Sequence, residues 1–436
     1  MKKVNFVSKP SKGLKGTIEV PGDKSISHRS VILGAIAEGS SKISGFLDGE
    51  DCLATIRAFQ AMNVKIEGPE KQQLVIHGVG KHGLRKPDEI IDCGNSGTTI
   101  RLLSGLLAVQ KFDSNLTGDS SLQKRPMERV RIPLMQMGAR MMSTNGKPPL
   151  NIRGGQILHG IDYDMPEASA QVKSCILLAG LYAQGTTTVI EKGITRDHTE
   201  RMLKTFSYPI EKNDNRITID STHKLIATDI TIPGDISSAA FLIVAATIIP
   251  DSEILIRNVG INPTRTGVIQ ILQRMGANIS IQNLRQYGDE PIADLSVSHA
   301  KLQGITIPEE LVPLAIDEFP VIFIAAACAQ GTTLLHGARE LRAKESDRIG
   351  SMVTGLQRLG IDVEGYEDGL KIVGGVIKGG VVDSYDDHRI AMSFAIAGAA
   401  ATGEVTVQDC LNVNTSFPNF VKTANSLQLA IKELSS

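Results

Sequence analysis

The chain lacks several features that would place it in a familiar class of protein. Its longest apolar runs, 241–249 and 321–329, fall far short of the roughly 20 residues that a membrane-spanning helix needs. The first ten residues carry no apolar segment as long as that of a signal peptide. The five cysteines are scattered and form no Cys-x-x-Cys pair, so they indicate neither a disulfide framework nor a zinc site. We therefore expect a soluble, cytoplasmic protein.

A charge excess and the common nucleotide motifs are missing as well. The 46 Lys and Arg residues are balanced by 47 Asp and Glu, which argues against a nucleic-acid or membrane partner, because either would need a basic face. Neither Gly-x-Gly-x-x-Gly after a strand nor Gly-Lys-Ser is present, which disfavours dinucleotide and NTP binding. His28 and His388 have no partner at metal-ligand spacing, and nothing else in the sequence requires a metal or another cofactor.

A recurring segment organises the chain. It consists of a polar opening, a run of small and aliphatic residues, a closing Gly or Pro, and a β-rich tail, and it first occurs at Pro21–Arg29. Successive openings are 68 to 80 residues apart. The six openings are marked by Ser27, Gly97, Ser169, Ser237, Asp317 and Asp387. A steady period of this length indicates six copies of one αβ supersecondary unit.

A second pattern predicts helices between the openings. Apolar residues at offsets 0, 3, 4 and 7 in 268–275 and 349–356 form one face of a helix in each segment. Gly276 and Gly360 follow, as glycine does at a helix end. Because short β-rich segments come next, each repeat is predicted as helix, strand, helix and strand, or with one more strand, on a mixed sheet or on a sheet with both helices on one side.

The repeats group into two halves. The frame Pro-Gly-Asp-x-Ser occurs at 21–25 and again at 233–237, which is 212 residues later and corresponds to three repeats. We therefore expect one domain over 22–234 and a second over 1–21 plus 235–436, with the strand near 16–20 folded onto the second.

The polar openings are candidate anion-binding groups. If the six helix amino termini converge, their N–H groups and partial positive charge form a surface for phosphates and carboxylates. The alternative for each residue taken singly is an ordinary helix cap. The candidates are Lys24, Ser25, Arg29, Gly97, Thr98, Ser169, Gln171 and Arg389.

Two charged segments add further candidates. Arg125 precedes a proline and is expected in extended chain at a helix start, the alternative being an exposed loop arginine. In 339–348 the cations Lys344 and Arg348 are four residues apart, which would place both on one face of a helix beside Glu345, the alternative being a solvated helix start. Asp317 opens a helix and could equally be its N-cap.

These motifs resemble the 5-enolpyruvylshikimate-3-phosphate synthase family. The resemblance extends from about Leu14 to Phe420 with the motifs in order. It is carried by Pro21–Arg29, Gly94–Thr98, Lys124–Met127, Ser169–Lys173, Lys344–Arg348, Asp387–Arg389 and Ser416–Pro418. It implies an α/β, two-domain enolpyruvyl transferase fold, in which each domain has three βαβαββ units and the two face a central cleft. It also implies a monomer that transfers the carboxyvinyl group of phosphoenolpyruvate to the 5-hydroxyl of shikimate 3-phosphate, with release of phosphate, on the route to chorismate and the aromatic amino acids.

The resemblance also assigns residues to each substrate. For shikimate 3-phosphate it implies Lys24, Ser25, Arg29, Ser169, Ala170, Gln171, Arg196, Asp317 and Lys344. For phosphoenolpyruvate it implies Lys24, Gly97, Arg125, Gln171, Arg348 and Arg389. Several cations suit two highly anionic substrates, because the arginine fork matches carboxylate and phosphate oxygens. As catalytic residues we expect Asp317 as base at the 5-hydroxyl, Glu345 as acid at the methylene carbon, and Lys24 in support.

Departures from the most familiar branch indicate a second class of the family. Ala170 replaces a serine, Arg196 stands where that branch has another residue, and Thr415 replaces a lysine. Members of this class are often less sensitive to glyphosate, so we expect reduced sensitivity, although Gly97, where an alanine would crowd the inhibitor, is retained.

Two alternatives remain at this point. A UDP-N-acetylglucosamine enolpyruvyl transferase shares the fold, but that family has a reactive cysteine near 118–125 and Lys-Asn in place of Lys24-Ser25. A non-catalytic anion-binding protein on the same scaffold would keep the arginines and lose the acid–base pair, yet Asp317 and Glu345 are both present.

Overall fold

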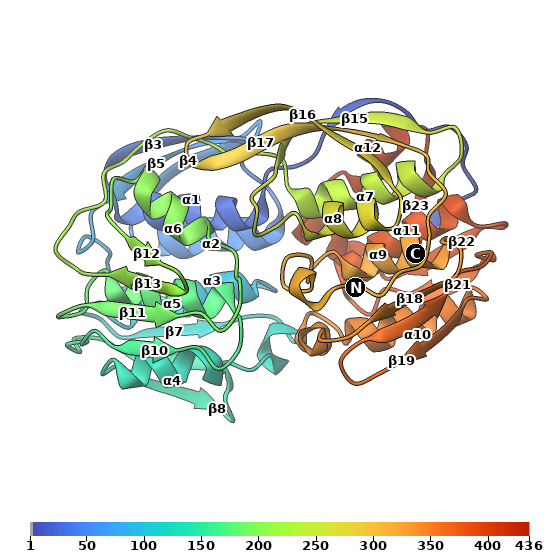
Figure 1. Ribbon diagram of the computed structural model, residues 1–436. Helices are drawn as coiled ribbons and strands as arrows, with labels where there is room; N and C mark the ends of the chain where they lie inside the picture. Colours follow the sequence, from blue (N-terminus) through green and yellow to red (C-terminus); the bar gives the residue numbers. More distant parts are fainter. Residues whose placement is uncertain (1–2, 436) are drawn as a thin grey trace. The chain divides into compact units, whose positions relative to one another are not determined.

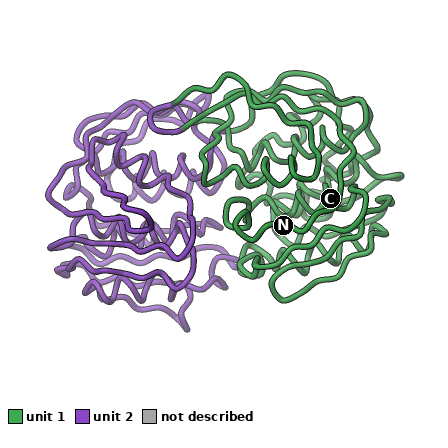
Figure 2. The backbone as a smooth tube through the Cα atoms, in the orientation of Figure 1, with its two compact units in different colours: residues 1–21, 233–286, 291–436 green, residues 22–232, 287–290 purple. Residues whose placement is uncertain are grey.

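The computed structural model describes residues 3–435, which form two compact units (Figure 2). Unit 1 contains the residues up to Pro21, Pro233–Gln286 and those from Pro291 onward, and unit 2 contains Gly22–Ile232 and Tyr287–Glu290. Each unit has its own hydrophobic core. The segment 287–290 therefore belongs to unit 2, whereas the sequence had placed it in the domain formed by 1–21 and 235–436.

Unit 2 holds the first three repeats (Figure 1). Its helices are α1 (Lys24–Ile36), α2 (Glu50–Ala61), α3 (Gly97–Leu107), the 3-10 helix η1 (Leu122–Lys124), α4 (Glu128–Gln136), α5 (Ala170–Gly180) and α6 (His198–Thr205). Its strands are β3 (Glu38–Ser44), β4 (Lys65–Glu70), β5 (Gln73–Val79), β6 (Ile91–Asp92), β7 (Ser114–Thr117), β8 (Arg140–Thr144), β9 (Lys147–Arg153), β10 (Asp162–Asp164), β11 (Thr187–Ile190), β12 (Glu211–Asn213), β13 (Arg216–Ile219) and β14 (Ile230–Thr231).

Unit 1 holds the other three. Its helices are α7 (Ile236–Ile248), α8 (Gly267–Arg274), η2 (Glu309–Leu311), α9 (Phe319–Ala327), η3 (Arg339–Ala343), α10 (Arg348–Arg358), α11 (His388–Ala400), η4 (Leu411–Thr415) and α12 (Phe420–Ser426). Its strands are β1 (Val4–Lys9), β2 (Lys15–Glu19), β15 (Glu253–Gly260), β16 (Asn278–Tyr287), β17 (Glu290–Ser298), β18 (Thr332–Leu335), β19 (Asp362–Gly365), β20 (Leu370–Val373), β21 (Gly380–Asp383), β22 (Val405–Gln408) and β23 (Ala430–Ser435).

The four-stranded sheets repeat one strand order, and the remaining sheet, β18-β20-β19, has three strands. In the orders β6-β7-β9-β8 and β10-β11-β13-β12 the first pair is parallel and the others are antiparallel, which is the βαβαββ pattern. The order β14-β3-β5-β4 repeats it, with β14 supplied from the end of unit 2. In unit 1, β2 pairs in parallel with β15, so the strand expected near 16–20 does join the carboxyl half. The mixed α/β class and the repeat are as the sequence predicted.

Each unit has three helices that are buried on nearly every side, namely α1, α3 and α5 in unit 2 and α7, α9 and α11 in unit 1. All six are labelled in Figure 1. A helix that is apolar all round belongs in a core, which explains their small and aliphatic sequences. These inner helices begin at the six polar openings. The amphipathic helices predicted at 268–275 and 349–356 are α8 and α10, and positive φ at Gly276 and Gly360 ends them.

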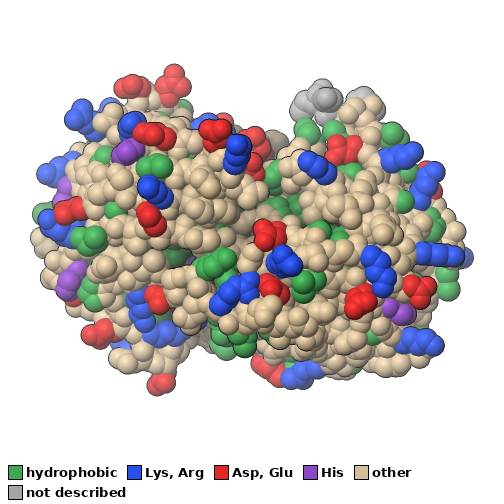
Figure 3. Space-filling view, turned by 90° about the horizontal axis from the view of Figure 1, so that it is seen from above, with side chains coloured by type: hydrophobic (Ala, Val, Ile, Leu, Met, Phe, Trp, Pro, Cys, Tyr) green, Lys and Arg blue, Asp and Glu red, His purple; other side chains and the backbone are tan. Residues whose placement is uncertain are grey.

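The surface carries mixed charge. On the face drawn in Figure 3, Lys and Arg side chains are interspersed with Asp and Glu. Over residues 3–435, none of the helices combines the length and the apolarity needed to cross a bilayer. Within the same residues, no group of three His, Cys, Asp or Glu side chains is arranged to hold a metal ion.

Candidate active site

The first group of site residues lies at the start of α1. The Asp23 side chain caps this helix by accepting a hydrogen bond from the N–H of Ile26 at 2.9 Å. Lys24, the first helical residue, forms an ion pair with Asp51 at the start of α2, and both side chains are largely buried. Ser25 is partly exposed beside it. Asp51 is a residue that the sequence analysis missed, because only folding brings it to Lys24.

Arg29, one turn further along α1, is buried and held by neutral partners. Its Nε donates to Thr199 Oγ1 at 2.7 Å, Nη2 to Ser174 Oγ at 2.7 Å, and Nη1 to the carbonyl of Ser25 at 3.0 Å. Burial lowers the pKa of Arg29 to about 10, although the negative charge of Glu200 opposes the shift. Arg29 therefore joins α1 to α5 and α6 in a fixed orientation.

The second group lies where α3 meets α5. Arg101 Nη1 donates to Gln171 Oε1 at 2.6 Å, and Gln171 Nε2 donates to Thr98 Oγ1 at 3.0 Å, so the amide of Gln171 is fixed from both ends. Arg125 is buried in extended chain, as expected, and its Nη2 donates to Asn95 Oδ1 at 2.6 Å. The exposed-loop alternative for Arg125 is wrong.

Gly97 sits between the two arginines of this group. A Cβ added there would lie 2.9 Å from Arg101 Nη1 and 3.0 Å from Arg125 Nη1. Arg101 was not among the candidates, although it closes the opening that begins at Asn95. The sequence feature that could have identified Arg101 is its position one helical turn after Gly97.

The third group opens α5. Ser169 is the N-cap, and its Oγ accepts from the N–H of Val172 at 3.4 Å, so the capping alternative holds for this residue. Ala170 and Gln171 follow in the first turn. Arg196 lies in the loop between β11 and α6, partly buried. All ten candidates from the amino-terminal half thus lie in unit 2.

In unit 1 the guanidinium of Arg348 contacts three carboxylates. Arg348 is only 1% exposed, and its Nη1 lies 3.3 Å from Asp317 Oδ1, its Nη2 2.6 Å from Glu345 Oε2, and its Nε 2.8 Å from Asp387 Oδ2. Burial alone would lower the pKa of Arg348, but the three negative charges outweigh it and raise that pKa above its ordinary value. The candidate base and the candidate acid are therefore held by one side chain.

The helical placement predicted for Lys344 is wrong. Helix α10 begins only at Arg348, where Asp347 caps it, and Lys344 is in extended backbone after η3. The two cations nevertheless meet at Asp317, because Lys344 Nζ lies 3.4 Å from its Oδ1. Tertiary contact, not a shared helix face, brings them together.

Asp317, Glu318 and Arg389 form the last group. Asp317 lies one residue before Glu318, the N-cap position of α9, so it is not the cap. Arg389 Nη1 donates to the carbonyl of Asp317 at 3.0 Å and lies 3.7 Å from buried Glu318. Asp387 caps α11 by accepting from the N–H of Arg389. Glu318 was missed by the sequence analysis; its only signal was a charge beside Asp317.

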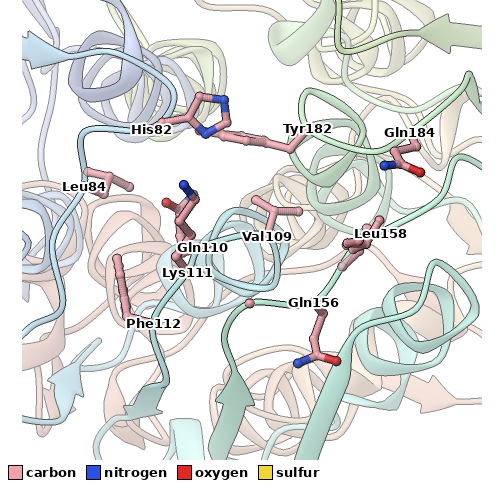
Figure 4. A pocket seen from close by; sticks show the side chains of 12 residues that line it. His82, Leu84, Val109, Gln110, Lys111, Phe112, Gln156, Leu158, Tyr182 and Gln184 are labelled. Carbon is pink, nitrogen blue, oxygen red and sulfur yellow. The ribbon is translucent and has the colours of Figure 1, made fainter.

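A pocket in unit 2 lies away from these residues (Figure 4). It has a volume of about 340 Å³, and its walls include His82, Gln110 and Tyr182, with the His82 and Tyr182 rings edge to face at 5.5 Å. Gln110 follows the end of α3 and Tyr182 follows the end of α5. Since the candidate residues sit at the beginnings of these helices, the pocket is separate from them.

Comparison with known proteins identifies the family of the chain. The profile of the EPSP synthase family (3-phosphoshikimate 1-carboxyvinyltransferase) matches residues 8–424. A curated 3-phosphoshikimate 1-carboxyvinyltransferase of Legionella pneumophila strain Lens is 65% identical over 432 residues, which cover 99% of this chain and 100% of that protein.

Solved structures lead to the same class. The enolpyruvyl transferase NikO from Streptomyces tendae has a TM-score of 0.81 at 16% identity, covers both chains fully, and shows the fold alone. EPSP synthase from Acinetobacter baumannii has a TM-score of 0.89 at 52% identity and covers 99% of this chain and 100% of its own. The enolpyruvyl transferase fold is thus established. The chain belongs to the EPSP synthase family.

Proposed function

We propose that this protein transfers the carboxyvinyl group of phosphoenolpyruvate to the 5-hydroxyl of shikimate 3-phosphate, with release of inorganic phosphate. The reaction belongs to the shikimate pathway of aromatic amino-acid biosynthesis. The observation that carries the proposal is the buried Arg348, which holds both Asp317 and Glu345. A non-catalytic anion-binding protein would have no use for two such carboxylates beside a cation.

Shikimate 3-phosphate binds, in this proposal, mainly to residues of unit 2. Arginine and lysine supply charge for the phosphate and carboxylate, while hydroxyl and amide groups orient the ring hydroxyls. The residues are Lys24, Ser25, Arg29, Ser169, Ala170, Gln171 and Arg196, with Asp317 and Lys344 of unit 1. The fixed amide of Gln171 supports this role, because a group held from both ends loses little entropy on binding.

Phosphoenolpyruvate binds to the remaining cations. The residues are Lys24, Gly97, Arg125, Gln171, Arg348 and Arg389. Gly97 supports this assignment, since the lack of a side chain lets the guanidinium groups of Arg101 and Arg125 lie against its backbone.

The chemistry requires two proton transfers in the addition stage and one at the methyl group in the elimination stage. The oxygen of the 5-hydroxyl attacks C2 of the enol while Asp317 takes the hydroxyl proton and Glu345 protonates the methylene carbon, which becomes a methyl group. In the second stage Glu345, which is now a carboxylate, takes a proton from the methyl group, the double bond re-forms, and the C–O bond to phosphate breaks so that inorganic phosphate departs. Lys24 stabilises the developing negative charge. No metal or other cofactor takes part in these steps.

The test is phosphate release from the purified protein with phosphoenolpyruvate and one of two acceptors. We expect release with shikimate 3-phosphate and none with UDP-N-acetylglucosamine. Release only with the nucleotide sugar would assign the protein to the other enolpyruvyl transferase reaction. Binding of both substrates without release would indicate the non-catalytic scaffold.

Assembly, compartment and inhibition belong to the same proposal. We expect a monomer, to be checked by sedimentation equilibrium. A cytoplasmic location is supported by the five cysteines, which are all free thiols, as is usual in a reducing compartment. Glyphosate should inhibit weakly, because Ala170 and Arg196 follow the less sensitive class, and tight competitive inhibition against phosphoenolpyruvate would contradict this expectation.

A further inference from the structure

A fully buried lysine lies within unit 2 on one of the inner helices. Lys173 is in α5, where its side chain has no exposed surface. Its Nζ lies 2.8 Å from Glu191 Oε1 and 2.5 Å from Glu200 Oε1, and both carboxylates are themselves buried. Buried charges of this kind must be paired, and here one cation bridges two anions. None of these three residues belongs to the candidate substrate contacts.

The two carboxylates stand at the two ends of one loop. Glu191 directly follows β11, and Glu200 lies in the first turn of α6, so the residues between them connect the strand to the helix. Lys192, Gly193 and Ile194 in this loop are exposed. The loop is therefore fastened at its ends by Lys173, while its first half has little contact with the core.

Thr195 is the first buried residue after the exposed residues of this loop. It is buried, and its Oγ1 donates to Glu191 Oε1 at 2.5 Å, the same oxygen that pairs with Lys173. Arg196 is the next residue. A hydrogen bond to a charged group is stronger than one between neutral partners, so this contact fixes the backbone immediately before Arg196.

The same cluster extends to Arg29. Thr199 accepts from Arg29 Nε, and the hydroxyls of Thr199 and Ser174 lie 2.7 Å apart. The negative charges of Glu191 and Glu200 face the positive charge of Lys173, with Lys212 Nζ 3.9 Å from Glu191 Oε2 and the charge of Arg29 acting on Glu200. Burying charges costs desolvation energy even when they are paired, and removing one partner of a buried pair is strongly destabilising, so the members of this cluster hold one another in place.

From these contacts we propose that Lys173, Glu191 and Thr195 are positioning residues that hold Arg196 ready for shikimate 3-phosphate. The proposal rests on the binding role given to Arg196 above. The sequence-level signal is a lysine in an otherwise apolar helix, which the motif Ser-Ala-Gln-Val-Lys contains. Without the clamp, the backbone immediately before Arg196 would have to be ordered when the substrate binds, and this ordering lowers the affinity.

The experiment measures the dissociation constant of shikimate 3-phosphate by titration calorimetry on the full chain, without phosphoenolpyruvate. Thr195→Val keeps the shape of the side chain and removes the hydroxyl, and we expect it to raise this constant about tenfold, or about 1.4 kcal/mol. Thr195→Ser, which keeps the hydroxyl, should remain within about twofold of the wild type. Thr247→Val is the matched control, because Thr247 is a buried threonine in α7 whose hydroxyl donates only to the carbonyl of Ile243.

A double-mutant cycle tests whether Thr195 acts through Arg196. In an Arg196→Leu background, Thr195→Val should have no further effect on the dissociation constant. An unchanged tenfold loss in that background, equal losses in the Thr195 and Thr247 variants, or no loss in Thr195→Val would each overturn the proposal. If Thr195→Val does not fold, Thr195→Ala, which also removes the hydroxyl and leaves the Lys173 ion pairs intact, enters the same cycle.

Failure of this inference can be told apart from failure of the proposed function. The wild-type protein is first assayed for phosphate release with shikimate 3-phosphate. If phosphate release is normal and the effects in the double-mutant cycle are additive, the positioning role is refuted and the proposed reaction stands. If phosphate release is absent, the proposed reaction itself is refuted.

Discussion

Gly97→Ala should impair substrate binding while leaving the fold nearly unchanged. The new Cβ would lie 2.9 and 3.0 Å from the Nη1 atoms of Arg101 and Arg125, closer than real Cβ contacts normally are. Both neighbours are ends of flexible side chains, so they can move away. Each is tied to a partner, however, Arg101 to Gln171 and Arg125 to Asn95, at 2.6 Å in both cases. A shift of these arginines therefore moves Arg125 and disturbs Gln171, which are among the residues proposed to contact the substrates.

The magnitude follows from the required movement. Restoring ordinary contact needs a shift of roughly 0.5 Å, and because a misplacement of 1 Å can cost about 100-fold, we expect kcat/KM for phosphoenolpyruvate to fall about tenfold. Gly105→Ala on the same helix is the contrasting variant, since its Cβ would lie 2.1 Å from the carbonyl oxygen of Cys175 in α5. There the backbone itself must move, at a net cost of about 2 kcal/mol after the gain in helix propensity.

The assay combines initial rates with thermal unfolding. Gly97→Ala should show the kinetic loss with a midpoint close to that of the wild type. Gly105→Ala should unfold about 4–8 °C lower. An unchanged kcat/KM for phosphoenolpyruvate in Gly97→Ala would refute the reasoning, and so would a fall in its midpoint as large as that of Gly105→Ala.

Three further variants probe other parts of the structure. Burial, followed by the charges of Lys24 and Arg29, holds the pKa of His28 well below its usual value, so the unfolded chain takes up the proton first and stability is lost as pH falls through about 6.5. Between pH 7.5 and 5.5 the free energy of unfolding, measured with urea, should fall about 1.4 kcal/mol further in the wild type than in His28→Gln, and equal falls would exclude His28 as the cause. Lys81→Met removes the donor to the carbonyls of Leu181 and Ser221, at 3.0 and 2.8 Å, and should cost about 1–3 kcal/mol of stability without changing either KM; a changed KM would contradict its purely structural role. Glu345→Gln should lower kcat at least about 100-fold with little change in shikimate 3-phosphate binding, and near-normal turnover would remove Glu345 as the acid.

Local patterns in the sequence predicted the parts of the fold that depend on local physics. The apolar faces of 268–275 and 349–356 became α8 and α10, because the 3.6-residue period reflects burial of one side of a helix. The polar openings became the amino termini of the inner helices, because a buried helix end needs a capping group, such as Ser96 or Asp235, wherever it occurs.

The contacts that the sequence did not reveal are those between distant segments. Asp51 meets Lys24 only because α2 packs on α1, and nothing in the spacing of the two residues indicates a pair. Lys344 was placed on a helix because it lies four residues before Arg348, yet η3 and the cap at Asp347 delay the helix start. The charge pattern predicted which residues lie together here, but it predicted the wrong backbone conformation for Lys344, because that conformation depends on contacts with distant segments.

The number of N–H donors on Arg348 limits how many carboxylates it can hold when substrate binds. A guanidinium has five N–H groups, and four contacts to Asp317, Glu345 and Asp387 already use four of them. A carboxylate of phosphoenolpyruvate bound bidentately to Arg348 must therefore displace one contact. Asp387 is fully buried and caps α11, and Asp317 is also paired with Lys344, so we propose that the substrate displaces Glu345, which lies in the short segment before α10.

Displacement of Glu345 from Arg348 would move this carboxylate away from the positive charge of the guanidinium, which favours the protonated form that the methylene carbon needs. The same competition predicts a second effect of Glu345→Gln. A neutral amide competes less well for Arg348, so phosphoenolpyruvate should bind more tightly by about 1 kcal/mol, or roughly fivefold, even as turnover falls. Equilibrium binding of phosphoenolpyruvate in the presence of shikimate 3-phosphate measures this directly. Weaker binding in the variant would mean that Glu345 supports the substrate contact and does not compete with it.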